Sequence, residues 1–215
     1  MPNPAYRIVT PNLVLRCWQP QDAPLLRAAF SPENLAHLRP YLYWAENEPR
    51  PLPETAQWLR ARRAQFDLDQ DYTYAIFNRE ENLVLGSSGL HTRSKDPLTR
   101  EIGYWIHVDY TQRGYAREAA AALTRVAFEH DGVHRIEIHC DPQNHASASI
   151  PRKLGYTLEA TLRARMRKPS GEWRDTLVWS LFAEDYPQTP CARAPLQAFD
   201  ALGSLILPSP HVANS

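Results

Sequence analysis

Residues 111–116, Thr-Gln-Arg-Gly-Tyr-Ala, have the types and order of an anion-binding turn between a strand-like segment and an alanine-rich helical segment. The first N–H groups of a helix lack helical partners, and the helix dipole favours a negative charge beside them. Gly114 lets an anion approach the backbone, Ala116 keeps the helix entrance narrow, and Arg113 and Arg117 add positive charge. The pattern is compatible with a pyrophosphate site, although the hexapeptide alone is more typical of an ordinary strand-to-helix turn.

A second segment follows about one crossover unit later, with Asn144-His-Ala-Ser147 leading into Ile150-Pro-Arg-Lys-Leu-Gly-Tyr156. Together the two segments resemble the GNAT superfamily of acyl-CoA N-acyltransferases. The surrounding residues 100–106 and 135–141 are similar to its RimJ/RimL-like branch, and the resemblance runs from about residue 13 to residue 182. The matching positions are Gly114, Ala116, Asn144, Ser147, Ile150, Gly155 and Tyr156.

The resemblance implies an N-acetyltransferase in which a primary amine attacks acetyl-CoA directly within a ternary complex. The acceptor is then a peptide or protein N-terminus, or a small-molecule amine. Backbone N–H groups near Trp105, Ile106, His107 and Val108 would bind the thioester carbonyl. The other implied cofactor contacts are Gln112, Arg113, Gly114, Tyr115, Ala116, Arg117, Asn144 and Tyr156; for Tyr156, core packing is an equally good interpretation.

Two groups are expected to move protons. An alkyl amine with a pKa of about 10 is protonated at neutral pH, so the attack requires a base. Glu101, which alternates with Gly103 and Trp105 along a strand, is the first candidate, against the alternative of a salt bridge to a nearby arginine. His91 and His107 are weaker candidates. The resemblance assigns the proton donor for the departing thiolate to Ser147.

Two departures from the family pattern weaken the match. Thr111 stands where a long polar side chain is usual, and Pro151 removes the N–H that would bond to the carbonyl of residue 147, so a kink is expected there. The departures favour the first of two alternatives that stay open. One is a catalytically silent acyl-CoA-binding module, and the other is an N-acyltransferase for another donor such as succinyl-CoA.

The composition excludes several other classes of function. The chain has 24 Lys and Arg against 24 Asp and Glu, so no net charge is available to attract nucleic acid or an anionic membrane. Three widely spaced cysteines favour neither disulfides nor zinc, and no metal-ligand cluster is evident. No signal peptide or membrane-spanning run is evident, so we expect a cytoplasmic protein, either a monomer or a homodimer.

The hydrophobic patterns predict one mixed α/β domain over residues 1–186, with helices on both faces of a mostly antiparallel sheet of about seven strands. Strands are expected at 13–18, 72–77, 83–90, 101–108 and 135–140, and in a hairpin around 169–171. Helices are expected at 54–66, 116–130 and 146–154. Residues 187–215 are expected to be a disordered tail or, through the apolar spacing of 196–206, one docking helix.

Two clusters remain open to interpretation. Arg39-Pro-Tyr-Leu-Tyr-Trp44 either lines an acceptor pocket or packs under the first helices. Arg163, Arg165 and Arg167 alternate along a strand, which predicts one arginine face exposed to solvent.

Overall fold

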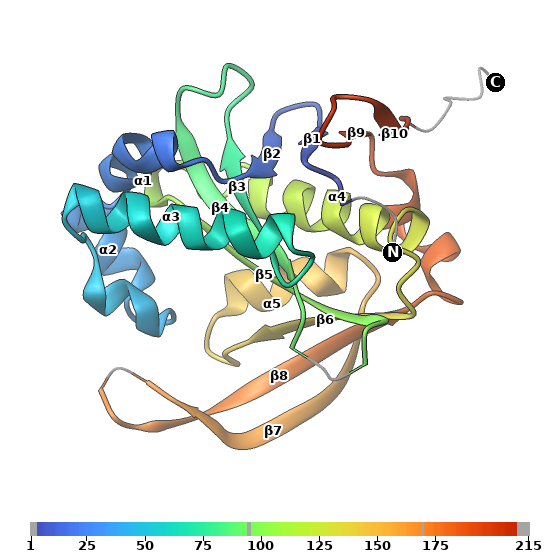
Figure 1. Ribbon diagram of the computed structural model, residues 1–215. Helices are drawn as coiled ribbons and strands as arrows, with labels where there is room; N and C mark the ends of the chain where they lie inside the picture. The colour runs from blue at the N-terminus through green and yellow to red at the C-terminus, as the bar shows by residue number, and fades with distance from the viewer. Residues whose placement is uncertain (1–3, 94–95, 169, 210–215) are drawn as a thin grey trace.

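A single ten-stranded sheet runs through the molecule in the order β10-β9-β1-β2-β3-β4-β5-β6-β8-β7 (Figure 1). The structure is a computed structural model, and it describes residues 4–93, 96–168 and 170–209. The strands are β1 (Arg7–Val9), β2 (Val14–Cys17), β3 (Tyr72–Phe77), β4 (Val84–His91), β5 (Thr99–Ile106), β6 (Arg135–Cys140), β7 (Thr157–Arg167), β8 (Trp173–Phe182), β9 (Gln197–Phe199) and β10 (Leu205–Leu207). The helices are α1 (Ala23–Ala29), α2 (Pro32–Leu38), α3 (Leu52–Asp67), α4 (Tyr115–Glu129) and α5 (His145–Lys153). The mixed, mostly antiparallel fold is confirmed, with more strands than the seven expected.

Strands β5 and β6 form the parallel pair of this sheet, joined by α4 as a crossover, and the other strand pairings that the structure describes are antiparallel. The parallel register ends where Glu101 pairs with Glu137. Beyond that point β5 continues to Ile106 and β6 to Cys140. In the described part of the chain, these later residues of β5 and β6 are not paired with each other. The sheet is therefore split along this line.

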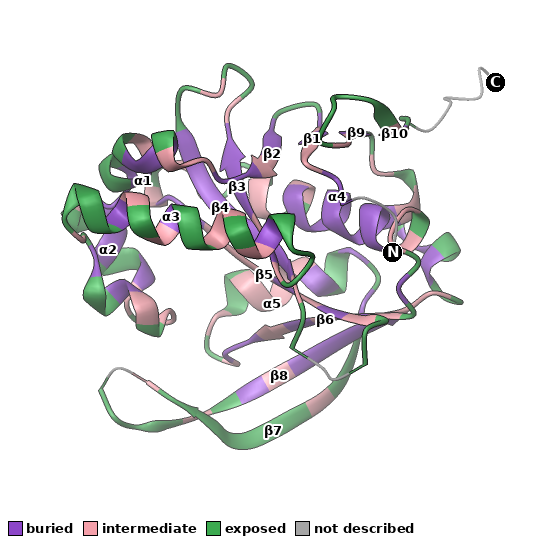
Figure 2. Ribbon diagram, viewed as in Figure 1, coloured by how far each residue is buried: buried purple, intermediate pink, exposed green. Residues whose placement is uncertain are grey.

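Helix α4 packs against one face of the sheet because its alanines are small enough to let the backbone come close. Residues 119–127 of α4 are buried, with Leu123 and Val126 at 0% exposure (Figure 2). Burying two such side chains contributes about 1.5–3 kcal/mol each. On the other face, α1, α2 and α3 bury Leu26, Leu35 and Leu59 in a second cluster. Helices α4 and α5 therefore lie on one face of the sheet, and α1, α2 and α3 lie on the other (Figure 1).

The segment after residue 187 differs from the expected tail or helix. It forms β9 and β10, and β9 pairs antiparallel with β1 at the sheet edge. The helical spacing is interrupted by a turn, because the Asp200 carboxylate accepts hydrogen bonds from the N–H groups of Leu202 and Ser204, at 2.9 and 2.8 Å. Leu202, which a docking helix would bury, is 91% exposed. Residues 210–215 of the predicted tail lie outside the described residues.

An α4 side chain ties this segment to the rest of the protein. Arg125 is 5% exposed and donates hydrogen bonds to the carbonyl oxygens of Ala194, at 3.0 Å, and Pro208, at 2.9 Å. Its Nε also bonds to Glu129 at 3.0 Å. The C-terminal strands are therefore anchored to the crossover helix as well as to β1.

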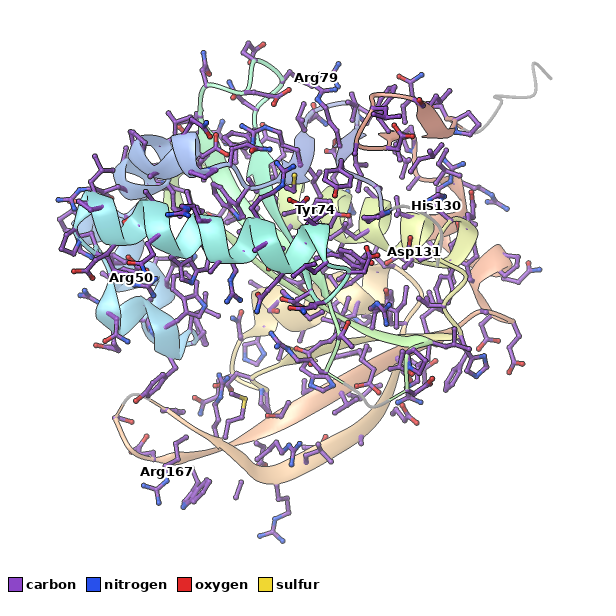
Figure 3. All side chains as sticks on the ribbon, viewed as in Figure 1. Arg50, Tyr74, Arg79, His130, Asp131 and Arg167 are labelled. Carbon is purple, nitrogen blue, oxygen red and sulfur yellow. The ribbon has the colours of Figure 1, made fainter. Side chains whose placement is uncertain are left out.

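The hairpin of β7 and β8 does not present the expected single face of arginines. Its register shifts between Leu162 and Met166, and Ala164 in between adopts a φ of 47°. Such a bulge places extra residues opposite one partner residue and breaks the alternation of faces. Arg167 lies near the outer end of the hairpin (Figure 3), where its guanidinium stacks 4.5 Å from the Trp173 ring centroid.

Asp131, just after α4, is a half-buried carboxyl group whose ionisation opposes folding. Burial raises its pKa to about 6, and Tyr74 lies nearby (Figure 3). A raised pKa means that folding favours the protonated form, so stability falls as the pH rises from about 4 through 6. We expect Asp131→Asn to raise the melting temperature at pH 8, with the gain shrinking toward pH 4.5.

Thermal unfolding at the two pH values checks this expectation, with the exposed Asp185→Asn as the matched control. An equal shift at both pH values would mean that the carboxyl group is not the cause.

Candidate active site

A cavity of about 1760 Å³ passes through the split in the sheet. Its wall includes side chains from both faces of β5, among them Glu101 on one face and Tyr104 on the other. Helices α4 and α5 bound it on one side of the sheet, and α2 and the β7–β8 hairpin on the other. Small-molecule sites usually measure about 300–1,000 Å³. This cavity is therefore larger than the usual site for one small molecule.

One end of the cavity is the predicted anion-binding turn. Gln112 and Gly114 both have left-handed backbones, with φ of 62° and 84°, which turns successive N–H groups in one direction. The first helical hydrogen bond of α4 runs from the N–H of Glu118 to the carbonyl of Gly114, so the N–H groups of residues 115–117 have no partner within the helix. Gln112, Arg113, Gly114, Tyr115, Ala116 and Arg117 all line the cavity.

The residues at 105–108 offer fewer free N–H groups than the sequence suggested. The N–H of His107 donates to a β4 carbonyl at 2.8 Å, and the N–H of Val108 donates to Oδ1 of the buried Asn34 at 3.0 Å. Because bonds alternate along an antiparallel strand, the N–H of Ile106 points the opposite way, toward the unpaired stretch of β6. Ile106 is therefore the residue of this stretch whose N–H faces the split.

Ser147 lies in the first turn of α5, where the side chain of Asn144 caps the helix by accepting its N–H at 3.0 Å. Both residues line the cavity. The Ser147 hydroxyl donates to the phenol oxygen of Tyr104 at 3.3 Å, and that phenol donates to the Ser147 carbonyl oxygen at 3.2 Å. Pro151 is the reason this carbonyl is available, since proline lacks the N–H that would bond to it.

Tyr104 reaches α5 from β5 and was not singled out from the sequence. Burial raises the pKa of its phenol above the ordinary value, so the group stays protonated and keeps its donor hydrogen. Because side chains alternate between the two faces of a strand, the sequence was sufficient to predict that Tyr104 lies on the face opposite to Glu101. The contact with Ser147 depends on how α5 packs across the sheet, which local sequence does not specify.

Glu101 lines the cavity on the other face of β5, next to a histidine from β6. Its Oε2 lies 3.5 Å from Nδ1 of His139, whose Nε2 lies 2.7 Å from Oε2 of Glu137. The partner of Glu101 is thus His139, a residue that sequence reasoning missed because it depends on the β5–β6 register. His91, the weaker base candidate, instead pairs with Asp71 at 3.0 Å and is not among the residues that line the cavity.

Aromatic side chains form the wall beside Glu101. Trp105 packs against Phe30 and Trp44, with ring centroids 5.6 and 6.0 Å away. Tyr41 and Trp44 belong to the aromatic cluster singled out in the sequence, and both line the cavity. Trp44 also packs against Phe30, and the role of the cluster in holding an acceptor stays a prediction.

Three of the predicted contacts lie away from the cavity. Tyr156 is 4% exposed, and its hydroxyl is hydrogen-bonded to Thr124 Oγ1 at 2.7 Å inside the core. His107 and Val108 are also absent from the described cavity wall, and burial lowers the pKa of His107. Tyr156 therefore packs in the core, and the assignment of these three residues to cofactor binding stays a prediction. Glu101, Trp105, Ile106, Asn144, Ser147 and the turn at 112–117 do line the cavity.

Other classes of site find little support in the described part of the chain. Among residues 4–93, 96–168 and 170–209, no group of three or more His, Cys, Asp or Glu is placed to hold a metal ion. None of the helices in these ranges has the length and apolar character needed to cross a membrane. Cys17, Cys140 and Cys191 are buried free thiols.

Comparison with known families gives a match over most of the chain. Residues 12–157 match the model of the acetyltransferase (GNAT) domain. A curated relative is the uncharacterized N-acetyltransferase YoaA of Bacillus subtilis, 25% identical over 172 residues, which are 80% of this chain and 94% of YoaA. Another is the uncharacterized N-acetyltransferase YnaD of the same organism, 27% identical over 55% of this chain and 68% of YnaD.

Solved structures share the fold. RimJ of Mycobacterium smegmatis, in complex with a coenzyme A disulfide, superposes with a TM-score of 0.77 at 22% identity, covering 89% of this chain and 94% of RimJ. A ribosomal-protein-S5-alanine acetyltransferase from Vibrio fischeri gives a TM-score of 0.71 at 21% identity, covering 84% of this chain and 98% of that one.

Proposed function

Because the chain belongs to the GNAT acetyltransferase family, we propose that this acetyl-CoA-dependent N-acetyltransferase acetylates the amino terminus of a peptide or protein, with both substrates bound at once. The observation that carries the proposal is the cavity through the sheet, which joins an anion-binding helix terminus on one face to a carboxylate-lined groove on the other. The name of the ribosomal-protein-S5-alanine acetyltransferase favours a polypeptide acceptor over a small amine.

The residues of the cavity fit coenzyme A. The N–H groups at the start of α4, with Arg113 and Arg117, suit a pyrophosphate. The pantetheine arm would run between β5 and α5, where Asn144 and Ser147 line the wall. Acetyl-CoA supplies a thioester whose carbonyl carbon the amine attacks.

The chain supplies three groups around that carbonyl. The N–H of Ile106 faces the split and would donate to the carbonyl oxygen, a role in which one donor contributes about 10²–10³ in rate. Glu101 would take the proton from the amine, with His139 and Glu137 beside it. The Ser147 hydroxyl would donate to the departing sulfur from the opposite face.

Measuring free CoA released from acetyl-CoA, with a mass spectrum of each acceptor, tests the proposal over a panel of peptides and small amines. We expect release with peptides and an added acetyl group on their α-amine. Release with small amines alone would overturn the polypeptide acceptor. Stabilisation by acetyl-CoA without release would indicate the silent binding module, and a preference for succinyl-CoA would indicate the other donor.

Tyr104 and Pro151 are expected to act as one unit on Ser147. Tyr104→Phe removes both hydrogen bonds to Ser147, so we expect kcat to fall about tenfold while the Kd for acetyl-CoA stays within about twofold. In the Pro151→Ala background the helix can supply an N–H to the Ser147 carbonyl, so the same change should cost less. Steady-state kinetics of the four variants in this cycle measure the coupling.

The cycle separates a positioning role from general damage. In the Ser147→Ala background, Tyr104→Phe should have little further effect on kcat. An undiminished tenfold loss there would mean that Tyr104 acts on something other than Ser147.

A further inference from the structure

The wall of the cavity opposite α4 is built by the β7–β8 hairpin, through Arg165, Met166, Arg174 and Thr176. None of these residues has a part in acetyl transfer as described above. They lie beyond β6 on the side of the sheet where Glu101 would meet the amine. These residues would therefore contact the part of the acceptor that extends away from its amine.

The backbone of β7 is strained at this wall. Leu162 pairs with Thr176 and Met166 pairs with Arg174, so residues 163–165 stand opposite Asp175 alone. Ala164, at the centre, has φ of 47°, a left-handed conformation that residues with a side chain rarely adopt.

An acidic side chain from the facing strand holds this bulge. Oδ1 of Asp175 accepts the N–H of Ala164 at 2.9 Å. Bulges beside active sites commonly redirect a side chain. Here Arg165 lines the cavity, whereas Arg163, two residues earlier on the same strand, is not among the residues that do.

Arg165 brings an uncommitted positive charge to the cavity. Within the described ranges, no hydrogen bond or ion pair joins its guanidinium to another residue, and the side chain is exposed. The neighbouring Arg174 differs, because its Nη1 lies 3.3 Å from Oδ2 of the buried Asp141. A cation held at a cavity wall without a protein partner is suited to an anionic group of a ligand.

Two further donors near the bulge lack acceptors. Thr176 is 4% exposed, and its Oγ1 has no hydrogen-bond partner in the described part of the chain. Nε of Arg174, two residues earlier on β8, also has no hydrogen-bond partner in the described part of the chain. Buried polar atoms in folded proteins are nearly always paired, so this pair of orphan donors marks a place where an acceptor atom is missing.

We propose that Arg165, Thr176 and Arg174 form a subsite for a carboxylate carried by the acceptor. The proposal rests on the acetyltransferase function above and specifies its acceptor, an amine with a carboxylate a short distance along the molecule. Glu101 and Glu137 attract the ammonium end, and the subsite receives the opposite charge. The carboxylate belongs either to an acidic side chain near a peptide N-terminus or to the α-carboxylate of a free amino acid.

Paired acceptors that differ only in the carboxylate test the subsite. One pair is a peptide with Asp or Asn as its second residue, and the other is a free amino acid and its amide. For the native chain we expect kcat/KM to be at least tenfold higher for the carboxylate member of one pair, and the pair that responds identifies the source. Arg165→Gln should bring the kcat/KM values of the two members within about twofold of each other.

Arg163→Gln is the matched control, since it removes the same charge from the same strand outside the cavity and should keep the preference intact. Thr176→Val should reduce the preference partially. A preference that survives Arg165→Gln, or that Arg163→Gln abolishes equally, would overturn the subsite.

Fluorescence anisotropy of the labelled Asp and Asn peptides gives a readout that does not require turnover. If acetyl transfer fails with every acceptor, the proposed function fails, yet tighter binding of the Asp peptide that is lost in Arg165→Gln would still support the subsite. Equal binding of the two peptides by the native chain would contradict it.

Discussion

Replacing Ser147 with alanine is expected to lower kcat about a hundredfold while the Kd for acetyl-CoA changes less than about threefold. General acids contribute about 10²–10⁴ in rate. The lower end applies here, because a thiol with a pKa near 8.5 is already a good leaving group. Single-turnover measurement of CoA release at saturating acetyl-CoA isolates the chemical step.

Ser149→Ala is the control for this prediction. It lies two positions further along the same helix, and its hydroxyl donates to the Ala146 carbonyl at 2.8 Å, so its loss removes a hydroxyl of the same kind without the contact to Tyr104. We expect its kcat to stay within about threefold of the native value. A Ser147→Ala variant with native kcat would exclude the hydroxyl as proton donor.

Replacing Glu101 with glutamine is expected to lower kcat/KM at pH 7 by about a hundredfold or more and to change the shape of the pH profile. Without the carboxylate, reaction depends on amine that is already neutral, so the rate should rise about tenfold per pH unit up to the pKa of a peptide amino terminus, near 8. The native chain should reach its plateau at a lower pH. Initial rates from pH 5.5 to 9 with one peptide acceptor distinguish the two curves.

The neighbouring carboxylate separates base catalysis from simple attraction of a cation. Glu137→Gln removes the same charge from β6 and leaves Glu101 beside His139. We expect Glu137→Gln mainly to raise the KM for the amine, without the steep pH dependence. If both variants raise KM alike and keep the native pH profile, Glu101 binds the amine and is not its base.

The sequence was sufficient to predict the elements whose signals are local. Gly114 followed by an alanine-rich segment predicted the turn and α4, and the pattern of residues 146–154 predicted α5. Strict alternation along residues 101–105 placed Glu101 and Trp105 on one strand face, and both line the cavity. The proton-transfer and cofactor-binding roles stay predictions.

Features that depend on distant pairings could not be predicted. His139 meets Glu101 only because β5 and β6 run in parallel register, and Tyr104 meets Ser147 only because α5 covers that strand. Tyr156 fitted the family pattern, yet its hydroxyl is bonded to Thr124 within the core. The left-handed Ala164 has no sequence signal either, since its stabilising contact comes from Asp175 on the facing strand.

The pairing of β1 with β9 has a consequence for how the chain folds during synthesis. Arg7 pairs with Phe199, so β1 acquires this neighbour only after all the residues between the two strands have been translated. Contacts between such distant residues form late, because the loop between them must close first. Until then, the outer edge of β1 is open to pairing with other nascent chains, which is a known route to aggregation. Shortening the chain before residue 197 would make that transient exposure permanent.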